Sequence, residues 1–328
     1  MTQDRLLALL TQAGSDWISG EEISRQLGIS RTAVWKQIER LRAAGYVLSA
    51  QTRLGYRLVS IPDAITPRAV LPGLTTARFG RQIEYRESVG STNDLAKQLA
   101  RAGASEGLAV IADEQVAGRG RLGRAWTTPR GSALALTLVL RPDLPPYQAP
   151  RVTLVAAVAV AEAVRQATGL PAEIKWPNDL QLRGRKFCGI LTEMEAEVER
   201  VLFLVCGVGM NVNLDAALLP AEVRETATSL LAEQGRPVSR AALVRAILER
   251  FESVYDELVA GHFDQVLDRW RRMSNTLGQE VRVQSVIGAP TLWGVAEDVD
   301  PDGALLVRDS EGQIHRVVAG EVTLRTGT

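Results

Sequence analysis

Arginines and glycines alternate in one short segment of this sequence, which runs from Gly118 to Arg124 and is closed by Trp126. An apolar segment at 108–112 precedes it and predicts a strand. Glycine lets the backbone approach an anion closely, and arginine offers forked donors that match carboxylate and phosphate oxygens. The segment therefore predicts a loop that closes over a small, multiply charged ligand. The alternative is a flexible basic loop that contacts nucleic acid or nothing, because glycine-rich patterns also arise by chance.

Histidine and cysteine contribute little to the chemistry that we expect. The two histidines, His262 and His315, lie far from the glycine-arginine segment, which argues against a Ser-His-Asp hydrolase and a His-rich metal centre. The two cysteines, Cys188 and Cys206, lie in apolar runs, so we expect buried free thiols and no disulfide framework. Lysine, arginine, backbone donors and ligand phosphates are left to carry the reaction.

Length and composition predict an ordinary globular protein of two or three domains. The chain has 328 residues, 46% of them hydrophobic, with 38 basic and 38 acidic side chains, so its overall charge indicates no class of partner. The N-terminus lacks the pattern of a signal peptide, and the longest apolar stretch, 152–161, is too short to span a bilayer. We expect a cytoplasmic protein without a membrane partner.

Residues 1–62 predict a winged helix-turn-helix domain. Two short helices joined by a tight turn extend from Gly20 to Glu39, and Ser30 is a candidate N-cap of the second. Segments 47–50 and 56–59 predict a hairpin, the wing. The pattern favours DNA binding over the alternative, a helical protein-interaction domain with a solvated basic face.

The second helix of this domain carries the candidate DNA-binding residues. Residues 29–58 hold six basic side chains and one acidic side chain, so this part of the chain could face phosphates. The apolar stripe of the helix leaves its other face to polar groups that would meet base edges and phosphates. The candidates are Ser30, Arg31, Thr32 and Lys36.

The rest of the chain predicts two further domains, so the fold class is multi-domain α+β. After a proline-bounded linker at 61–67, strands and helices alternate through a central domain that we place at 63–273. Beyond Gly278, short alternating segments separated by turns predict a small β-barrel at 274–328. In the central domain we expect strands at 83–87, 108–112, 134–140 and 172–176, and helices at 154–167, 243–258 and 263–272.

Five motifs in a fixed order carry a resemblance to a known family. They are Glu87–Asn93, Glu114–Arg124, Lys175–Leu180, Arg185–Glu193 and Gly207–Asn213. Between a winged helix and a small barrel, this order resembles the biotin protein ligases in their bifunctional form, the biotin operon repressors. The resemblance covers essentially the whole chain. It implies a central mixed α/β ligase domain of class II synthetase type and an SH3-like C-terminal barrel.

The resemblance also implies an activity in two steps. The biotin carboxylate attacks the α-phosphate of ATP, which enters with Mg²⁺, and gives biotinyl-5′-adenylate and pyrophosphate. A lysine of the biotin carboxyl carrier protein of acetyl-CoA carboxylase then attacks the acyl carbon and releases AMP. Operator DNA is the second partner, and a homodimer that forms when ligand binds is expected.

The family's site residues are carried over onto matching positions of this sequence. Fixed Arg and Lys donors would stabilise the charge that develops on phosphate and acyl oxygen. The resemblance makes Arg121 and Lys186 catalytic. The biotin site comprises Ser91, Thr92, Asn93, Gln115, Arg119, Gly120, Arg121 and Lys186. The ATP and adenylate site comprises Lys175, Asn178, Asp179 and Asn211, with Asn178 and Asp179 near the metal and no metal site made by protein ligands alone.

Simpler interpretations of these residues stay open at the level of sequence. Segment 91–93 could be a helix N-cap only, and Asn211 could cap a strand end. Lys175 could pair with Asp179 on a turn, and Lys186 could form a solvated basic pair with its neighbour Arg185.

Leu122 departs from the family pattern, because some members carry a charged or small residue at this position. Its apolar side chain lowers the positive charge of the loop and would pack over the ligand once the loop closes. Two other functions remain as alternatives. One is a transcription factor whose central domain only senses a ligand, and the other is a lipoate ligase without DNA binding.

Overall fold

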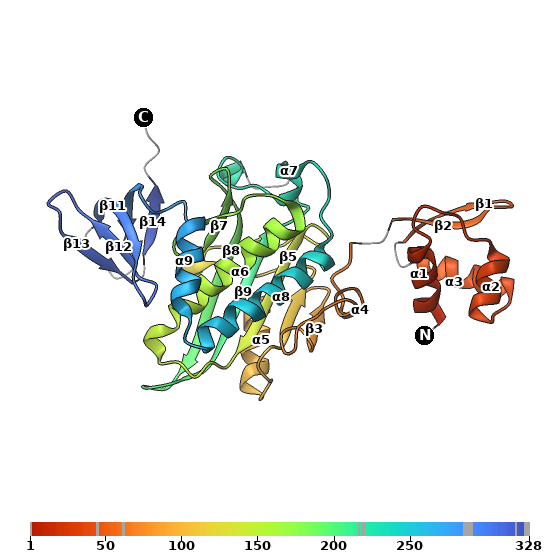
Figure 1. Cartoon of the computed structure of the whole chain (residues 1–328), viewed down its shortest axis with the longest axis horizontal. Coiled ribbons are helices and arrows are strands. Elements are labelled where there is room, and N and C mark those ends of the chain that lie inside the picture. Colours follow the sequence, from red (N-terminus) through yellow and green to blue (C-terminus); the bar gives the residue numbers. More distant parts are fainter. Residues whose placement is uncertain are drawn as a thin grey trace. The chain divides into compact units, whose positions relative to one another are not determined.

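The computed structural model describes residues 2–43, 46–60, 63–215, 217, 221–284, 291–318 and 320–324. The chain separates into two compact units, Met1–Asp63 and Ala64–Thr328 (Figure 1). Residues 61 and 62 of the predicted linker lie outside the described residues.

The first unit is a three-helix domain with a two-stranded wing. It consists of α1 (Thr2–Gln12), α2 (Gly20–Leu27), α3 (Arg31–Ala43), β1 (Val47–Gln51) and β2 (Gly55–Ser60), with the two strands antiparallel. Gly28 ends α2 in the left-handed conformation at φ 66°, which glycine adopts at little cost. The Oγ of Ser30 accepts from the amide of Ala33 at 3.2 Å, so the predicted N-cap is confirmed. Leu6, Leu10, Ile23, Leu27, Val34, Ile38, Leu41 and Leu48 form the core.

A seven-stranded mixed sheet organises the second unit. Its strand order is β3-β4-β5-β9-β8-β7-β6, and β3 and β4 are parallel whereas the other neighbours are antiparallel. The strands are β3 (Ile83–Arg86), β4 (Ala109–Ala112), β5 (Ala133–Leu140), β6 (Glu173–Lys175), β7 (Asp179–Leu182), β8 (Arg185–Ala196) and β9 (Val201–Asn211). The four predicted strands are therefore present in this sheet.

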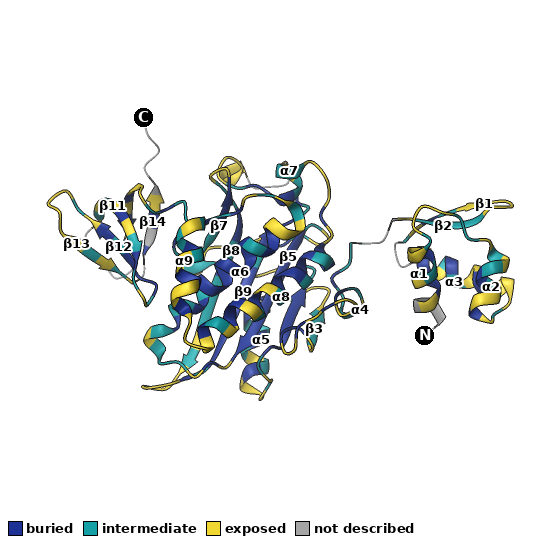
Figure 2. Cartoon of the chain, in the orientation of Figure 1, coloured by how far each residue is buried: buried dark blue, intermediate teal, exposed yellow. Residues whose placement is uncertain are grey.

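Helices cover both faces of this sheet (Figure 1). The helices of the second unit are α4 (Pro67–Val70), α5 (Thr92–Arg101), α6 (Pro150–Thr168), α7 (Leu230–Gln234), α8 (Arg240–Val259) and α9 (Phe263–Met273), with short 3-10 turns at Arg121–Gly123, Pro146–Gln148 and Ala221–Val223. The apolar helix α6 is buried along most of its length, as Figure 2 shows, and it packs with α8 and α9 over one face. The shorter α5 covers the other face.

Strand alternation decides which residues of the sheet are available to a ligand. In β9, Leu204, Cys206 and Met210 belong to the large core under α6, whereas Val205 packs in the smaller cluster with α5. Because successive side chains point to opposite faces, Gly207, Gly209 and Asn211 share the face of Val205. The same alternation in β8 gives that face to Gly189, Leu191 and Glu193.

The C-terminal segment forms a five-stranded antiparallel sheet. Its order is β13-β12-β11-β10-β14, with β10 (Glu280–Gln284), β11 (Leu292–Val299), β12 (Leu305–Arg308), β13 (Ile314–Val317) and β14 (Glu321–Leu324). The predicted barrel thus takes the form of an open sheet over the described residues, where β13 and β14 are its two edges. The alternating segments at 281–283, 292–295, 304–307 and 314–318 predict its first four strands, whereas no sequence pattern predicts β14.

Candidate active site

A cavity of about 550 Å³ lies in the second unit, on the α5 face of the central sheet. All the residues predicted to bind biotin, ATP or the adenylate line it. They come from the start of α5, the glycine-arginine loop, the turn between β6 and β7, and strands β8 and β9. Ser91 and Asn211, 120 positions apart in the chain, therefore share one site, as their motifs predicted.

Glycines form the floor of this cavity, because Gly189, Gly207 and Gly209 line it on neighbouring strands. A Cβ on Gly207 would collide with the amide of Asn93. A Cβ on Gly209 would lie 2.5 Å from Nε1 of Trp126, closer than real side-chain carbons approach other atoms. The bare backbone here leaves room for Asn93 and Trp126 to lie flat against the sheet.

Substitution Gly209→Ala tests this close packing. The added methyl group would displace Trp126 and with it the end of the glycine-arginine loop, while the strand itself keeps its pairing. We expect a melting temperature within a few degrees of wild type and a KM for biotin or ATP raised by about tenfold. Thermal unfolding and steady-state adenylation measure the two effects. An unchanged KM would mean that the position of Trp126 does not affect ligand binding.

One end of the cavity is a network of uncharged polar groups. Oε1 of Gln115 accepts from the amide of Thr92 at 2.8 Å and from its hydroxyl at 3.0 Å. Nε2 of Gln115 donates to Oγ1 of Thr128 at 3.1 Å. The side chain of Ser91 makes no capping hydrogen bond to α5, although Ser91 occupies the N-cap position. The N-cap interpretation therefore does not account for these side chains.

Asn93 extends the network toward the sheet. Its Oδ1 accepts from the hydroxyl of Thr137 at 2.8 Å, and its Nδ2 donates to the carbonyl of Leu191 at 3.1 Å and to Glu193 at 2.8 Å. Asn93 and Thr137 are buried, and buried amides with their donors and acceptors satisfied are held in one orientation. This end suits a ligand group that offers both hydrogen-bond donors and acceptors.

The glycine-arginine loop folds back on itself over the cavity. The amide of Gly120 donates to the carbonyl of Arg124 at 2.7 Å, and that of Trp126 donates to the carbonyl of Gly118 at 2.9 Å. Leu122 has a positive φ of 57° and is more than half exposed, so it does not pack on the sheet in this structure.

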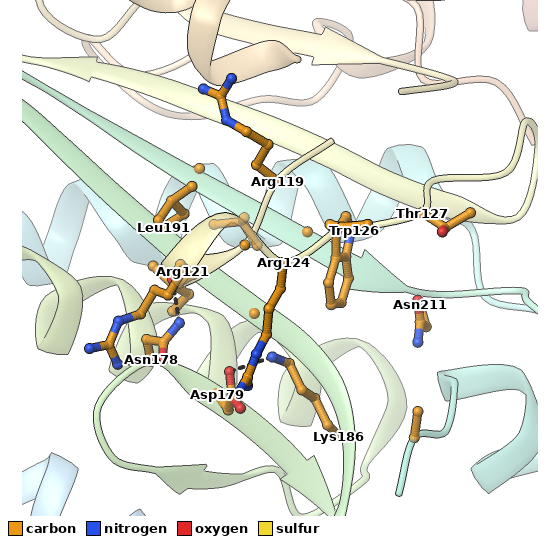
Figure 3. A pocket seen from close by; sticks show the side chains of 18 of the residues that line it. Arg119, Arg121, Arg124, Trp126, Thr127, Asn178, Asp179, Lys186, Leu191 and Asn211 are labelled. Carbon is orange, nitrogen blue, oxygen red and sulfur yellow. Dashed lines mark hydrogen bonds and ion pairs between the residues drawn. The ribbon is translucent and has the colours of Figure 1, made fainter. Parts of the chain in front are cut away.

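Arg119 is held at the margin of the cavity. Its guanidinium pairs with Asp94 at 2.6 Å, and Figure 3 shows it pointing away from the pair that Asp179 and Lys186 form. The hydrogen bond raises the pKa of Arg119 and lowers the pKa of Asp94, so both groups are charged at neutral pH. A ligand carboxylate would have to compete with Asp94 for this arginine.

The opposite end of the cavity is charged. Nζ of Lys186 lies 2.6 Å from a carboxylate oxygen of Asp179 and 5.5 Å from the ring centre of Trp126 (Figure 3). The guanidinium of Arg121 donates to Oδ1 of Asn178 at 3.3 Å. Asp179 thus pairs with the lysine of the adjacent strand.

The backbone fixes Lys186 on the cavity side of its strand. Its amide donates to the carbonyl of Thr226 and its carbonyl accepts from Thr228, each at 2.8 Å. The preceding residue, Arg185, turns to Glu233 instead, at 2.6 Å. Because the two side chains point to opposite sides, the solvated-pair interpretation of Arg185 and Lys186 is wrong.

Asn211 and Trp126 complete the wall between the two ends. Asn211 is buried and its Nδ2 donates to the carbonyl of Thr228 at 3.0 Å. Nε1 of Trp126 is buried and has no hydrogen-bond partner within the described part of the chain. A buried donor without a partner costs free energy unless a ligand or water accepts from it.

The C-terminal segment contacts the turn between β6 and β7. The indole of the buried Trp176 donates to the carbonyl of Gly303 at 3.1 Å, and its amide donates to Oγ1 of Thr276 at 2.9 Å. These contacts anchor the turn that carries Asn178 and Asp179. Gly320 and Val322 also line the cavity. Sequence reasoning missed this contribution because it depends on contacts between distant segments.

Two further residues, one that lines the cavity and one that supports its lining, carried a weak signal in the sequence. Trp126 was noted only as the residue that closes the glycine-arginine run, without a role. Thr137 contacts the lining residues Thr92 and Asn93 from an otherwise apolar strand, where a hydroxyl needs a buried partner. That interruption could have identified it.

The predicted DNA-binding side chains occupy the solvent side of α3. Val34, Ile38 and Leu41 are buried in the first unit, whereas Arg31, Thr32 and Lys36 are exposed. Ser30 differs, because its side chain caps the helix. Trp35 is 53% exposed on the same face and adds an apolar group to this basic surface.

Neither cysteine lines the cavity. Both cysteines are free and buried, as predicted, and burial raises the pKa of Cys206 to about 12 and also that of Cys188. Over the described residues, no three His, Cys, Asp or Glu side chains are grouped so that they could hold a metal ion. Within the same ranges, none of the helices has the length and hydropathy needed to span a membrane.

Comparisons with known families agree with this arrangement. The Biotin/lipoate A/B protein ligase family matches residues 85–211, an HTH domain matches 2–57, and the Biotin protein ligase C terminal domain matches 276–325. The chain is 40% identical to the Bifunctional ligase/repressor BirA of Bacillus spizizenii over 319 residues, which is 97% of each chain. It is 30% identical to the Escherichia coli protein of the same name, over 98% of this chain and 97% of that one.

The fold is also that of a solved ligase. A biotin protein ligase from Aquifex aeolicus in complex with biotin and ATP matches with a TM-score of 0.64 and 27% identity, covering 75% of this chain and 100% of that one. A mixed α/β ligase domain preceded by a helix-turn-helix domain is typical of a ligase that also binds DNA. The chain belongs to the family of bifunctional biotin protein ligases and repressors. The predicted family, fold class and class of enzyme are confirmed.

Proposed function

We propose that this protein forms biotinyl-5′-adenylate from biotin and ATP, transfers biotin to a lysine of a biotin carboxyl carrier protein, and represses transcription in response to biotin. One observation carries the ligase proposal: a single cavity joins the polar network around Gln115 to the charged group around Lys186. A ligand with a polar head and a carboxylate would span these two ends.

Biotin would bind with its ureido group at the polar end. Ser91, Thr92, Asn93 and Gln115 offer donors and acceptors there, and a preorganised network binds such a group without reorganising. The ligand carboxylate would extend toward Arg119, Gly120, Arg121 and Lys186.

Arg121 and Lys186 would act on the first step. As a carboxylate oxygen of biotin attacks the α-phosphorus of ATP, the P–O bond to pyrophosphate breaks and negative charge grows on the phosphate oxygens. The ammonium of Lys186 has three N–H donors, so it can contact this charge while one donor stays on Asp179. Donors fixed in advance stabilise such a transition state most effectively. In the second step an acceptor amine attacks the acyl carbon, and AMP leaves with the electron pair of the C–O bond.

The nucleotide would lie at the opposite end, against Lys175, Asn178, Asp179 and Asn211. The buried indole N–H of Trp126 has no hydrogen-bond partner in the described part of the chain, so a ligand acceptor would satisfy it if the loop rearranged on binding. Mg²⁺ commonly binds through one or two carboxylates together with substrate phosphates, and Asp179 offers such a carboxylate within the cavity. The cation would offset the charge of the triphosphate.

Pyrophosphate exchange dependent on both biotin and ATP tests the ligase proposal, followed by incorporation of labelled biotin into a carrier protein. Exchange without transfer to any carrier would support a sensor that only makes the adenylate. Exchange with lipoate in preference to biotin would support the lipoate ligase alternative. No exchange would support a transcription factor that senses a ligand without ligation.

The first unit would bind an operator through Arg31, Thr32 and Lys36, with Ser30 capping the helix that carries them. The domains would be 1–62, 63–273 and 274–328, and the separation after Asp63 supports the first boundary. A homodimer formed on ligand binding would place two winged helices on a symmetric site. ATP, carrier protein and operator DNA would all be met in the cytoplasm.

The glycine-arginine loop should become protected when ligand binds. Ordering its backbone costs conformational entropy, which contacts from Arg119 and Arg121 to the ligand would offset. Trypsin cleavage between Arg119 and Arg124 is expected to slow markedly when biotin and ATP are added, whereas cleavage in the first unit should serve as the internal control. Equal cleavage of the loop with and without ligand would contradict closure.

A further inference from the structure

Arg240 is a charged residue in the interior of the second unit. It begins α8, and its side chain is only 2% exposed. A fully buried guanidinium is rare, and the positive end of a helix dipole disfavours a cation at this position. Local preferences and burial therefore both argue against arginine here, so its contacts must supply the reason for it.

The contacts of Arg240 join the ends of two neighbouring strands. Its Nη1 donates to Oδ1 of Asp113 at 2.7 Å and to the carbonyl of Ala133 at 2.9 Å. Asp113 follows the last residue of β4, and Ala133 is the first residue of β5. The two strands are antiparallel, with Ala112 opposite Ala135, so the end of β4 and the start of β5 lie side by side. One guanidinium therefore fixes both strand ends.

Each of these anchor points leads directly to a lining residue of the cavity. Gln115 is two residues beyond Asp113, and it accepts both hydrogen bonds from Thr92. On the other side, Ala133 pairs with Asn211 across β5 and β9. Gln115 and Asn211 line the cavity, whereas Arg240 does not line it and contacts Asp113 and Ala133.

We propose that Arg240 is a positioning residue for biotin binding: by joining Asp113 to the first residue of β5, it holds Gln115 against Thr92 at the polar end of the cavity. The proposal rests on the proposed function, since it takes that end to bind biotin. Loss of the anchor would let the segment from Asp113 to Gln115 move, and the ligand would meet a less ordered network. Because this network holds biotin equally before and during reaction, KM should rise while kcat changes little.

Two variants separate positioning from the stability of a buried ion pair. Arg240→Met leaves the carboxylate of Asp113 without its partner, so it should lower the melting temperature and raise the KM for biotin together. The second variant, Arg240→Met with Asp113→Asn, removes both charges, and most of the melting temperature should return. In this double variant we expect the KM for biotin to stay about tenfold above wild type, with kcat within about twofold.

Arg269→Met is the matched control. Arg269 pairs with Glu257 and Glu162, is 24% exposed, and none of the three residues lines the cavity. This variant should lower the melting temperature without raising the KM for biotin.

A double variant with both melting temperature and KM restored would overturn the proposal, because Arg240 would then serve stability alone. A KM raised equally in Arg269→Met would overturn it as well, since any loss of stability would produce the effect. Pyrophosphate exchange by the wild-type protein keeps the two proposals apart. Its absence would reject the proposed function, whereas normal exchange with an unaffected double variant would reject only the role of Arg240.

Discussion

Substitution Lys186→Met is expected to slow the formation of biotinyl-adenylate by about a hundredfold, which corresponds to about 3 kcal/mol of transition-state stabilisation. Methionine keeps most of the length and apolar surface of lysine, but it removes the ammonium that lies 5.5 Å from the ring centre of Trp126. What is lost is the positive charge 2.6 Å from Asp179, at the end of the cavity where charge develops on phosphate. Single-turnover adenylation with saturating biotin and ATP measures the effect on the chemical step.

Arg101→Met is the control for this experiment. Arg101 is a basic residue of the same domain whose ion pair with Glu195 is exposed and outside the cavity. It should adenylate biotin at the wild-type rate, because exposed ion pairs contribute little. Near wild-type adenylation by Lys186→Met would reject the catalytic role of this residue, whatever the behaviour of the control.

The sequence was sufficient to predict which residues line one cavity, because these residues lie in compact motifs. Glycine, arginine and lysine at fixed spacing in five segments identified the residues that later proved to share one cavity. The order of the motifs supplied the long-range information that local patterns lack.

Other features depended on contacts that no local pattern contains. The helix expected at 154–167 begins at Pro150 instead, since proline is well tolerated in the first turn of a helix. The helix expected from 243 begins at Arg240, because Ser239 caps it. Strand β14 is a four-residue segment, defined only by its pairing with β10. The anchor at Arg240 was also missed, because its partner Asp113 lies 127 residues away.

The opposite faces of the central sheet explain how one domain can combine a rigid core with a ligand site. On one face, large apolar residues pack under α6 and fix the strands. On the other, glycines at positions 189, 207 and 209 open space for a ligand on the same strands. Rigid strands beneath a glycine-rich loop provide a geometry in which ligand binding can change the surface without disturbing the core.

Biotin together with ATP is expected to tighten binding of this protein to the promoter of its own biotin genes, by about 5- to 150-fold, the usual range of coupling between two sites. A single winged helix makes few phosphate contacts, so useful affinity requires two copies on a symmetric site. If the adenylate promotes dimerisation through the central domain, it raises operator affinity without contact with the DNA-binding face. Gel-shift titration at fixed salt, with and without the ligands, measures the change.

Variants of the first unit show whether α3 is the face that binds. Lys36→Ala removes an exposed charge from this helix, so it should weaken operator binding and reduce the slope of log K against log salt by about 1 for each contacted phosphate. Arg25→Ala on α2 is the control, because Arg25 is exposed and already paired with Glu22. It should leave the slope unchanged, and both variants should adenylate biotin normally.

Operator binding that is equally tight without ligand would reject the coupling. If the protein does not bind the operator at any concentration, the winged helix has another role in this enzyme. Excess unmodified carrier protein should relieve repression, because a protomer engaged with the carrier would be unable to dimerise.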